Sequence, residues 1–164
     1  MAKACPSCPA VGRRLFGSTA SEPMTIAFAM TRDVYTIAPT ASTGEAAHIM
    51  RAQRIGMLPV VDAGRLAGVI TDRDIALSAF VDGTHSGTPV FRLMRDAAQV
   101  CSENEEIEAV LARMAAYRAY RMPVCDTKGR VVGVVTLGDI AQCAPQTEGL
   151  IQTLAEVSHR TGFV

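Results

Sequence analysis

The chain has 164 residues, 49% hydrophobic and 20% charged, which is enough for one ordinary domain or two very small domains sharing a core. Its 16 Lys and Arg residues balance its 16 Asp and Glu residues, and this balance argues against a broad basic surface for nucleic acid. No apolar run approaches the ~18 residues of a membrane-spanning helix, so we expect neither nucleic acid nor a membrane among its partners.

Residues 1–23 differ in composition from the rest of the chain. They are rich in Pro, Gly and small residues, have no acid before Glu22, and lack the long apolar stretch of a secretory signal. We therefore expect a flexible leader; a transit peptide and a start at Met24 are the alternatives. Cys5 and Cys8 form a C-x-x-C pair whose role stays open, because no second pair follows at zinc-finger spacing. The odd total of five cysteines fits a reducing cytoplasm better than a disulfide framework.

Residues 25 to about 143 contain two copies of one sequence unit. Aligned positions lie 64 residues apart before the hairpin turn and 65 apart after it, where one residue is inserted; they pair Met30 with Met94, Pro59 with Pro123, Asp62 with Asp126, Gly68 with Gly133, Thr71 with Thr136, and Asp74 with Asp139. The two copies share both the hydrophobic pattern and the turn residues, which indicates two repeats of the same fold.

The first copy predicts a strand, a helix, a hairpin and a second helix. Apolar alternation and helical spacing place these elements at Val34–Ile37, Thr43–Gln53, Met57–Val61 with Arg65–Thr71, and from Asp72 onward. Ala63-Gly64 is expected to form a tight turn between the hairpin strands.

The second copy predicts the same order. Its strand falls at Ala98–Cys101, its helix at Asn104–Ala116, and its hairpin, with a longer turn, ends before a helix that starts at Leu137. A copy of about sixty residues buries too little surface to be stable alone. We therefore predict a mixed α/β fold of two β-α-β-β-α repeats packed by pseudo-twofold symmetry. The segments Ile26–Met30 and Val90–Met94 are expected to connect one copy to the other.

The division of the chain follows from these elements. We expect a leader over residues 1–23, the first repeat over 24–82, a linker over 83–87, the second repeat over 88–144, and a C-terminal amphipathic helix over 145–164. The apolar face of this last helix should consist of Leu150, Ile151, Leu154 and Val157.

Each copy ends its hairpin with Thr-x-x-Asp, as Thr71–Asp74 and Thr136–Asp139. One interpretation is structural, because Thr at a helix N-cap with an acid three residues later is close to a capping box. The other is a ligand site at the edge of the sheet, where open α/β sheets bind ligands. A carboxylate accepts hydrogen bonds from the two hydroxyls of a ribose, while a Thr hydroxyl and helix N–H groups donate to a phosphate.

The stretches IGMLPVVDAGRLAGVITDRDI and YRMPVCDTKGRVVGVVTLGDI resemble the cores of CBS domains, and their duplication resembles a free-standing CBS pair, or Bateman module. The resemblance covers residues 25 to about 143. It implies a sensor that binds AMP, ADP, ATP or S-adenosylmethionine without turning it over, with no cofactor required beyond Mg²⁺ alongside ATP. A cytoplasmic homodimer that regulates an unidentified protein is the implied setting.

The resemblance also implies two clefts, each with residues from both copies. Carried over by position, one cleft consists of Thr136 and Asp139 with the backbone near Tyr120 and Arg121, joined by Thr36, Ala41, Ile55, Gly56 and Met57. The other consists of Thr71 and Asp74, joined by Gln99, Ala119, Tyr120 and Arg121. In each, ribose would meet Asp and phosphate would meet Thr and a nearby Arg.

The two copies differ at the predicted clefts. Arg73 is matched by Gly138, Thr36 by Gln99, and Gly56 by Tyr120. We therefore expect two sites of unequal affinity and favour the Asp139 cleft over the Asp74 cleft. The alternative function is a dimerisation or partner-docking scaffold that binds no ligand, in which the two threonines only cap helices.

Overall fold

The computed structural model describes residues 24–96 and 99–158, so the predicted leader with Cys5 and Cys8 lies outside the described residues, as does Ala98 of the predicted strand. The chain forms two compact units. One unit combines the described residues up to Asp33 with Val100–Val124 and those from Val132 on; the other combines Val34–Gln99 with Cys125–Val131. A mixed α/β fold with two repeats is confirmed.

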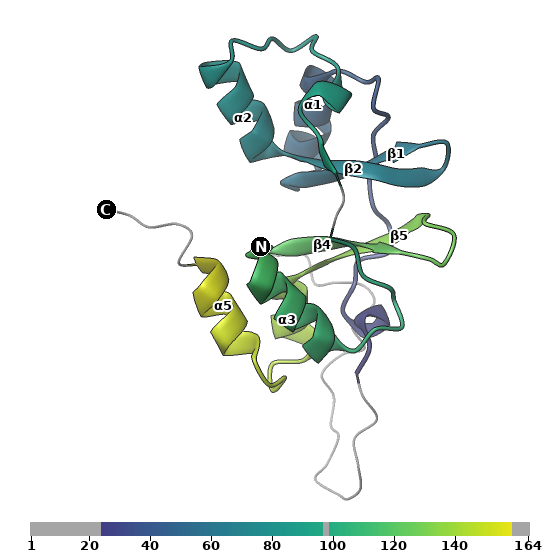
Figure 1. The fold of residues 1–164 in the computed structure, drawn as a ribbon, viewed down its shortest axis with the longest axis vertical. Coiled ribbons are helices and arrows are strands. Elements are labelled where there is room, and N and C mark those ends of the chain that lie inside the picture. The colour runs from purple at the N-terminus through teal and green to yellow at the C-terminus, as the bar shows by residue number, and fades with distance from the viewer. Residues whose placement is uncertain (1–23, 97–98, 159–164) are drawn as a thin grey trace, which may run out of the picture. The chain divides into compact units, whose positions relative to one another are not determined.

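The unit that contains Val34–Gln99 is built on a three-stranded antiparallel sheet in the order β1-β2-β3. Its strands are β1 (Met57–Asp62), β2 (Arg65–Thr71) and β3 (Arg95–Asp96). Figure 1 shows α1 (Thr43–Gln53) and α2 (Asp72–Val81) on one side of the β1–β2 hairpin. The buried core between them consists of Ile37, Ala46, Met50, Leu58, Val60, Ile70 and Val90.

The turn between β1 and β2 forms as its sequence predicts. Ala63 and Gly64 both have positive φ, at 45° and 78°, which is the conformation that a two-residue hairpin turn needs. The two hairpin strands and the start of α2 thus agree with the prediction from the sequence of the first copy.

The unit that contains Val100–Val124 is built on the second hairpin. It contains all but the turn-side end residue of each of β4 (Arg121–Cys125) and β5 (Val131–Thr136), and its helices are α3 (Ile107–Tyr117), α4 (Leu137–Cys143) and α5 (Leu150–Ser158). The core is aliphatic, with Ile107, Leu111, Met114, Met122 and Ile140 fully buried. Across the part of the chain that the structure describes, none of the helices has the length and apolar character needed to cross a membrane.

The segments that precede each copy pack against the other copy, as predicted. The short 3-10 helix Ile26–Phe28 is held by hydrogen bonds from Ile26 and Ala27 N–H to the Glu105 and Glu103 carbonyls, both 2.9 Å. The equivalent helix Val90–Arg92 is held by a bond from Val90 N–H to the Ala41 carbonyl, 2.8 Å. Each unit therefore contains a segment that belongs to the other repeat in sequence.

Two glycines permit this exchange. A Cβ built on Gly68 would lie 2.6 Å from the Arg95 carbonyl oxygen, and one on Gly133 would lie 2.9 Å from the Thr31 carbonyl oxygen. Real Cβ atoms do not approach so closely. The aligned glycines therefore allow the exchanged backbone to pass directly over each hairpin.

Of the predicted strands, Val34–Ile37 and the described residues of the second, Gln99–Cys101, are each reduced to one bridge, at Ile37 with Val60 and at Cys101 with Val124. Ile37 N–H donates to the Pro59 carbonyl at 3.1 Å, and Cys101 N–H donates to the Pro123 carbonyl at 3.1 Å. The next bond of a parallel ladder would need an N–H from that proline, which proline lacks. The prolines that mark the repeat thus end these strands.

Two predictions about helices need correction. The helix predicted from Asn104 begins at Ile107, because Ser102 N–H bonds the Glu105 carboxylate at 2.6 Å and forms a turn first. Ile151, predicted to share the apolar face of α5 with Leu150, Leu154 and Val157, is 82% exposed. Thr153 is buried in its place, with its hydroxyl 3.5 Å from the Leu111 carbonyl, while Leu150 and Val157 are buried as predicted.

The β4–β5 turn is organised by Asp126. Its Oδ1 accepts from the N–H groups of Lys128 and Arg130, both at 2.9 Å, and its Oδ2 accepts from Arg130 Nε at 2.7 Å. These bonds, led by the backbone bond from Arg130, lower the pKa of the Asp126 carboxyl. Burial, with help from the Asp126 charge, raises the pKa of the neighbouring Cys125 thiol, so that thiol stays protonated at neutral pH.

Candidate functional site

The first Thr-x-x-Asp motif forms a complete capping box at the start of α2. Thr71 is the N-cap, in extended conformation after β2, and its Oγ1 accepts from Asp74 N–H at 3.2 Å. Asp74 Oδ2 accepts in return from Thr71 N–H at 3.0 Å and from the Thr71 hydroxyl at 2.6 Å. The structural interpretation of the motif is therefore correct for the first copy.

The second motif repeats this geometry at the start of α4. Thr136 Oγ1 accepts from Asp139 N–H at 3.1 Å, and Asp139 Oδ2 accepts from Thr136 N–H at 2.9 Å and from its hydroxyl at 2.7 Å. In both copies the capping box uses one carboxylate oxygen and holds the side chain in a fixed rotamer. The hydroxyl hydrogen of each threonine is also used within the motif.

The backbone before each hairpin meets the capped helix. Asp72 N–H donates to the Gly56 carbonyl at 3.4 Å, and Leu137 N–H donates to the Tyr120 carbonyl at 3.0 Å. Gly56 and Tyr120 are aligned in the repeat, so the same arrangement occurs twice. Each unit thus brings together a Thr-Asp pair and the loop that precedes its own hairpin.

The first motif has a partner that the sequence reasoning missed. Asp74 Oδ1 forms an ion pair with Nη2 of Arg95 at 2.6 Å; the Asp74 side chain is 16% exposed and the Arg95 side chain 55%. Arg95 lies on β3, opposite Val69 of β2. The repeat aligns Arg95 with Thr31, but only the strand pairing seen in the structure places Arg95 beside the first copy's hairpin.

The remaining predicted residues are divided between the two units. Thr36, Ala41, Ile55, Gly56, Met57, Thr71, Arg73, Asp74 and Gln99 belong to one; Ala119, Tyr120, Arg121, Thr136, Gly138 and Asp139 belong to the other. Thr36, Arg73 and Gly138 are exposed, whereas Met57 is buried and contributes to the sheet. The Tyr120 hydroxyl donates to Ser158 of α5 at 3.2 Å, so the end of that helix lies beside the loop that precedes β4.

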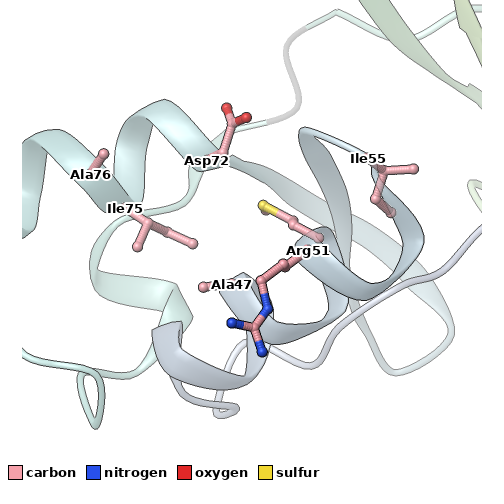
Figure 2. Close-up of a pocket in the computed structure, with 7 residues that line it drawn as sticks. Ala47, Arg51, Ile55, Asp72, Ile75 and Ala76 are labelled. Carbon is pink, nitrogen blue, oxygen red and sulfur yellow. The ribbon is translucent and has the colours of Figure 1, made fainter.

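A separate groove of about 340 Å³ runs between α1 and α2. It is lined by Ala47, Met50, Arg51, Ile55, Asp72, Ile75 and Ala76, of which only Ile55 belongs to the predicted set. Figure 2 shows the Arg51 and Asp72 side chains pointing to opposite sides of it. The groove is mainly apolar and lies on the helical face of the unit.

Among the residues that the structure describes, no three His, Cys, Asp or Glu side chains gather as they would around a metal ion.

Comparison with known proteins gives a consistent result. The family model for the CBS domain matches residues 25–79 and 90–145. The CBS domain-containing protein YhcV of Bacillus subtilis is 35% identical over 131 residues, covering 80% of this chain and 93% of that protein. Hypoxic response protein 1 of Mycobacterium tuberculosis is 37% identical over 103 residues, covering 62% of this chain and 71% of that protein.

Solved structures of similar fold are also CBS domain pairs. The CBS domain pair of protein MJ0100, solved in complex with 5′-methylthioadenosine and S-adenosyl-L-methionine, matches with a TM-score of 0.67 and 30% identity. The match covers 74% of this chain and 95% of that chain.

Proposed function

The chain belongs to the CBS domain family, and from this premise we propose that it is a regulatory module that binds an adenosyl ligand at its two Thr-x-x-Asp motifs. The observation that carries the proposal is the second capping box. It uses only Oδ2 of Asp139, and the described residues show no hydrogen bond or ion pair to Oδ1. A rigidly held, part-buried carboxylate oxygen is therefore left to accept hydrogen bonds from ribose hydroxyls.

The ligand class follows from this chemistry and from the relatives. The 30% identical CBS pair of MJ0100 was solved with two adenosyl compounds, 5′-methylthioadenosine and S-adenosyl-L-methionine. We propose AMP, ADP, ATP or S-adenosylmethionine here, with Mg²⁺ accompanying ATP. The adenine would lie among apolar side chains near the Gly56 and Tyr120 loops. The ligand is bound and released unchanged, so we propose no catalytic activity.

Each proposed cleft draws on both repeats. Thr136 and Asp139 would be joined by the first copy's Thr36, Ala41, Ile55, Gly56 and Met57, and Thr71 and Asp74 by Gln99 and the segment Ala119, Tyr120 and Arg121. A ligand that contacts both repeats favours one of their arrangements, and this population shift is the proposed signal to a regulated protein. We propose the cytoplasm as its compartment, because the odd cysteine count fits a reducing environment.

The experiment is titration of the whole chain with AMP, ADP, ATP and S-adenosylmethionine by isothermal calorimetry, with thermal melts alongside. At least one ligand should give saturable heat and raise the melting temperature, because a ligand that binds only the folded state stabilises it by mass action. Absence of both effects up to millimolar concentrations of all four compounds would contradict the proposal.

A second candidate function is favoured by one specific observation. Both threonine hydroxyls are already hydrogen-bonded within their capping boxes, which is what a ligand-free dimerisation or docking scaffold requires. On that account the calorimetric experiment gives no heat, and Asp139→Ala costs only about 1 kcal/mol of capping energy.

We also propose that the protein is a homodimer formed through the α1–α2 face. Leu77, Phe80 and Val81 form one stripe along α2 and are 51%, 92% and 76% exposed. The groove beside them has Arg51 on one wall and Asp72 on the other, which suits a twofold contact with a second copy. In the other unit, α5 packs on α3 within the same chain.

The Phe80→Asp variant tests this interface. It places a charge in the centre of the apolar stripe, so we expect the mass measured by light scattering to fall from that of two chains to that of one. Ile151→Asp is the matched control, since Ile151 is 82% exposed on α5 and should leave the dimer intact. A wild-type monomer, or a Phe80→Asp dimer as tight as wild type, would refute the assignment.

A further inference from the structure

The two Asp side chains of the repeat differ in what they contact. Oδ2 of each is used in the same way, by the N–H and hydroxyl of its own threonine. Asp74 Oδ1 is bound by the Arg95 guanidinium at 2.6 Å, whereas the described residues show no comparable cation on Asp139. The carboxylate of the first copy is therefore occupied on both oxygens, and that of the second copy on one.

The difference arises from one aligned position. Arg95 lies opposite Val69, two residues before Thr71, and Thr31 lies opposite Val134, two residues before Thr136. Each residue belongs to the segment that packs on the other repeat. The backbone of Arg95 passes over Gly68, and that of Thr31 passes over Gly133. One unit therefore has the long, positively charged side chain of Arg95 at this position, and the other unit has the short, neutral side chain of Thr31.

This ion pair changes what the first site can bind. Ribose hydroxyls that approach Asp74 must compete with Arg95 for Oδ1. The guanidinium that they displace then needs another anion, because it stays beside the site on a fixed strand. A phosphate supplies one and can form two charge-assisted hydrogen bonds with a guanidinium. Adenosine supplies none, and S-adenosylmethionine has a sulfonium cation at the 5′ position where AMP has its phosphate, with its carboxylate only at the end of the methionyl chain.

Resting on the proposed function, we infer that Arg95 is the specificity-determining residue of the Asp74 site and reserves it for adenosyl ligands that carry a phosphate. The exposed Arg73 on the first turn of α2 adds positive charge nearby. The Asp139 site, with Thr31 in the aligned position, has no such requirement. The two sites therefore differ in ligand class as well as in affinity.

The test measures the first site alone, in the full chain carrying Asp139→Ala, with AMP and adenosine as the probes. In this background AMP should bind at least about tenfold more tightly than adenosine, since one charge-assisted contact is worth roughly that factor. Adding Arg95→Thr should bring the two dissociation constants to within about threefold of each other, whereas Arg95→Lys should retain most of the preference for AMP. Arg92→Thr removes an exposed arginine from the same segment and should leave the preference unchanged.

The outcomes separate this inference from the proposed function. If wild type binds no adenosyl ligand, both fail. If wild type binds but the Asp139→Ala protein binds neither probe, or if Arg95→Thr leaves the AMP-to-adenosine ratio unchanged, the inference about Arg95 is wrong and the proposed function stands. Circular dichroism melts of each variant confirm that the protein titrated is folded.

Discussion

The Gly68→Ala variant is expected to unfold at a clearly lower temperature than the wild-type protein. The added Cβ would lie 2.6 Å from the Arg95 carbonyl oxygen, and a strand carbonyl cannot rotate away as the end of a flexible side chain can. Overpacking of this kind costs about 1–3 kcal/mol of the free energy of unfolding, and each kcal/mol lowers the melting temperature by roughly 2–4 °C in a chain of this size. Differential scanning calorimetry measures the change.

The repeat provides both a second example and a control. Gly133→Ala should act in the same direction but less strongly, because its Cβ meets the Thr31 carbonyl at 2.9 Å and the adaptable Met30 sulfur at 2.9 Å. Gly138→Ala should be neutral or stabilising, since its nearest neighbour is 3.5 Å away and alanine is the better helix former. A Gly68→Ala protein that melts at or above the wild-type temperature would show that the crossing segment does not pack as described.

The Asp139→Ala variant is expected to weaken binding of the preferred adenosyl ligand about 100-fold. Two ribose hydroxyls lose an ionised acceptor, and a hydrogen bond to a charged group contributes roughly 1.5–3 kcal/mol, where about 1.4 kcal/mol is a factor of ten. Asp74→Ala should weaken binding less, because Arg95 already competes for that carboxylate. Calorimetric titration of the two variants under the same conditions measures the difference.

Both Asp variants lose the same capping contact, and Asp74→Ala also loses its ion pair with Arg95. Each loses about 1 kcal/mol of capping energy, and Asp74→Ala loses up to about 1 kcal/mol more with the partly exposed ion pair, so its melting temperature should fall at least as far as that of Asp139→Ala. Equal loss of affinity in the two proteins would refute the inequality of the sites. Loss of affinity only in proportion to loss of stability would favour the scaffold function.

Much of the fold was predictable because the sequence contains two copies of one unit, and the same pattern in both copies supports the same elements. The hairpin strands, the Ala63-Gly64 turn and the start of α2 at Asp72 depend on local pattern and turn chemistry, and all agree with the structure. The capping boxes were predictable for the same reason, because Thr and Asp three residues apart interact within one helical turn.

What the sequence reasoning missed depends on contacts between distant segments. The strands at Ile37 and Cys101 fail because their neighbours are Pro59 and Pro123, and pairing with a proline is visible only once the partner strand is known. Ile151 has the right helical spacing for a packed face, yet Thr153 occupies that face beside Leu111. The Arg95–Asp74 pair joins residues 21 positions apart through a β-bridge that no local pattern encodes.

The central claim is that this CBS pair binds an adenosyl ligand through its two Thr-x-x-Asp carboxylates. Titration of wild type and of the Asp74→Ala/Asp139→Ala double variant with AMP tests it most directly. We predict saturable binding to wild type, and no detectable binding to a double variant that still melts cooperatively. Binding of AMP to the double variant with wild-type affinity, or no binding to wild type at millimolar AMP, would contradict the claim.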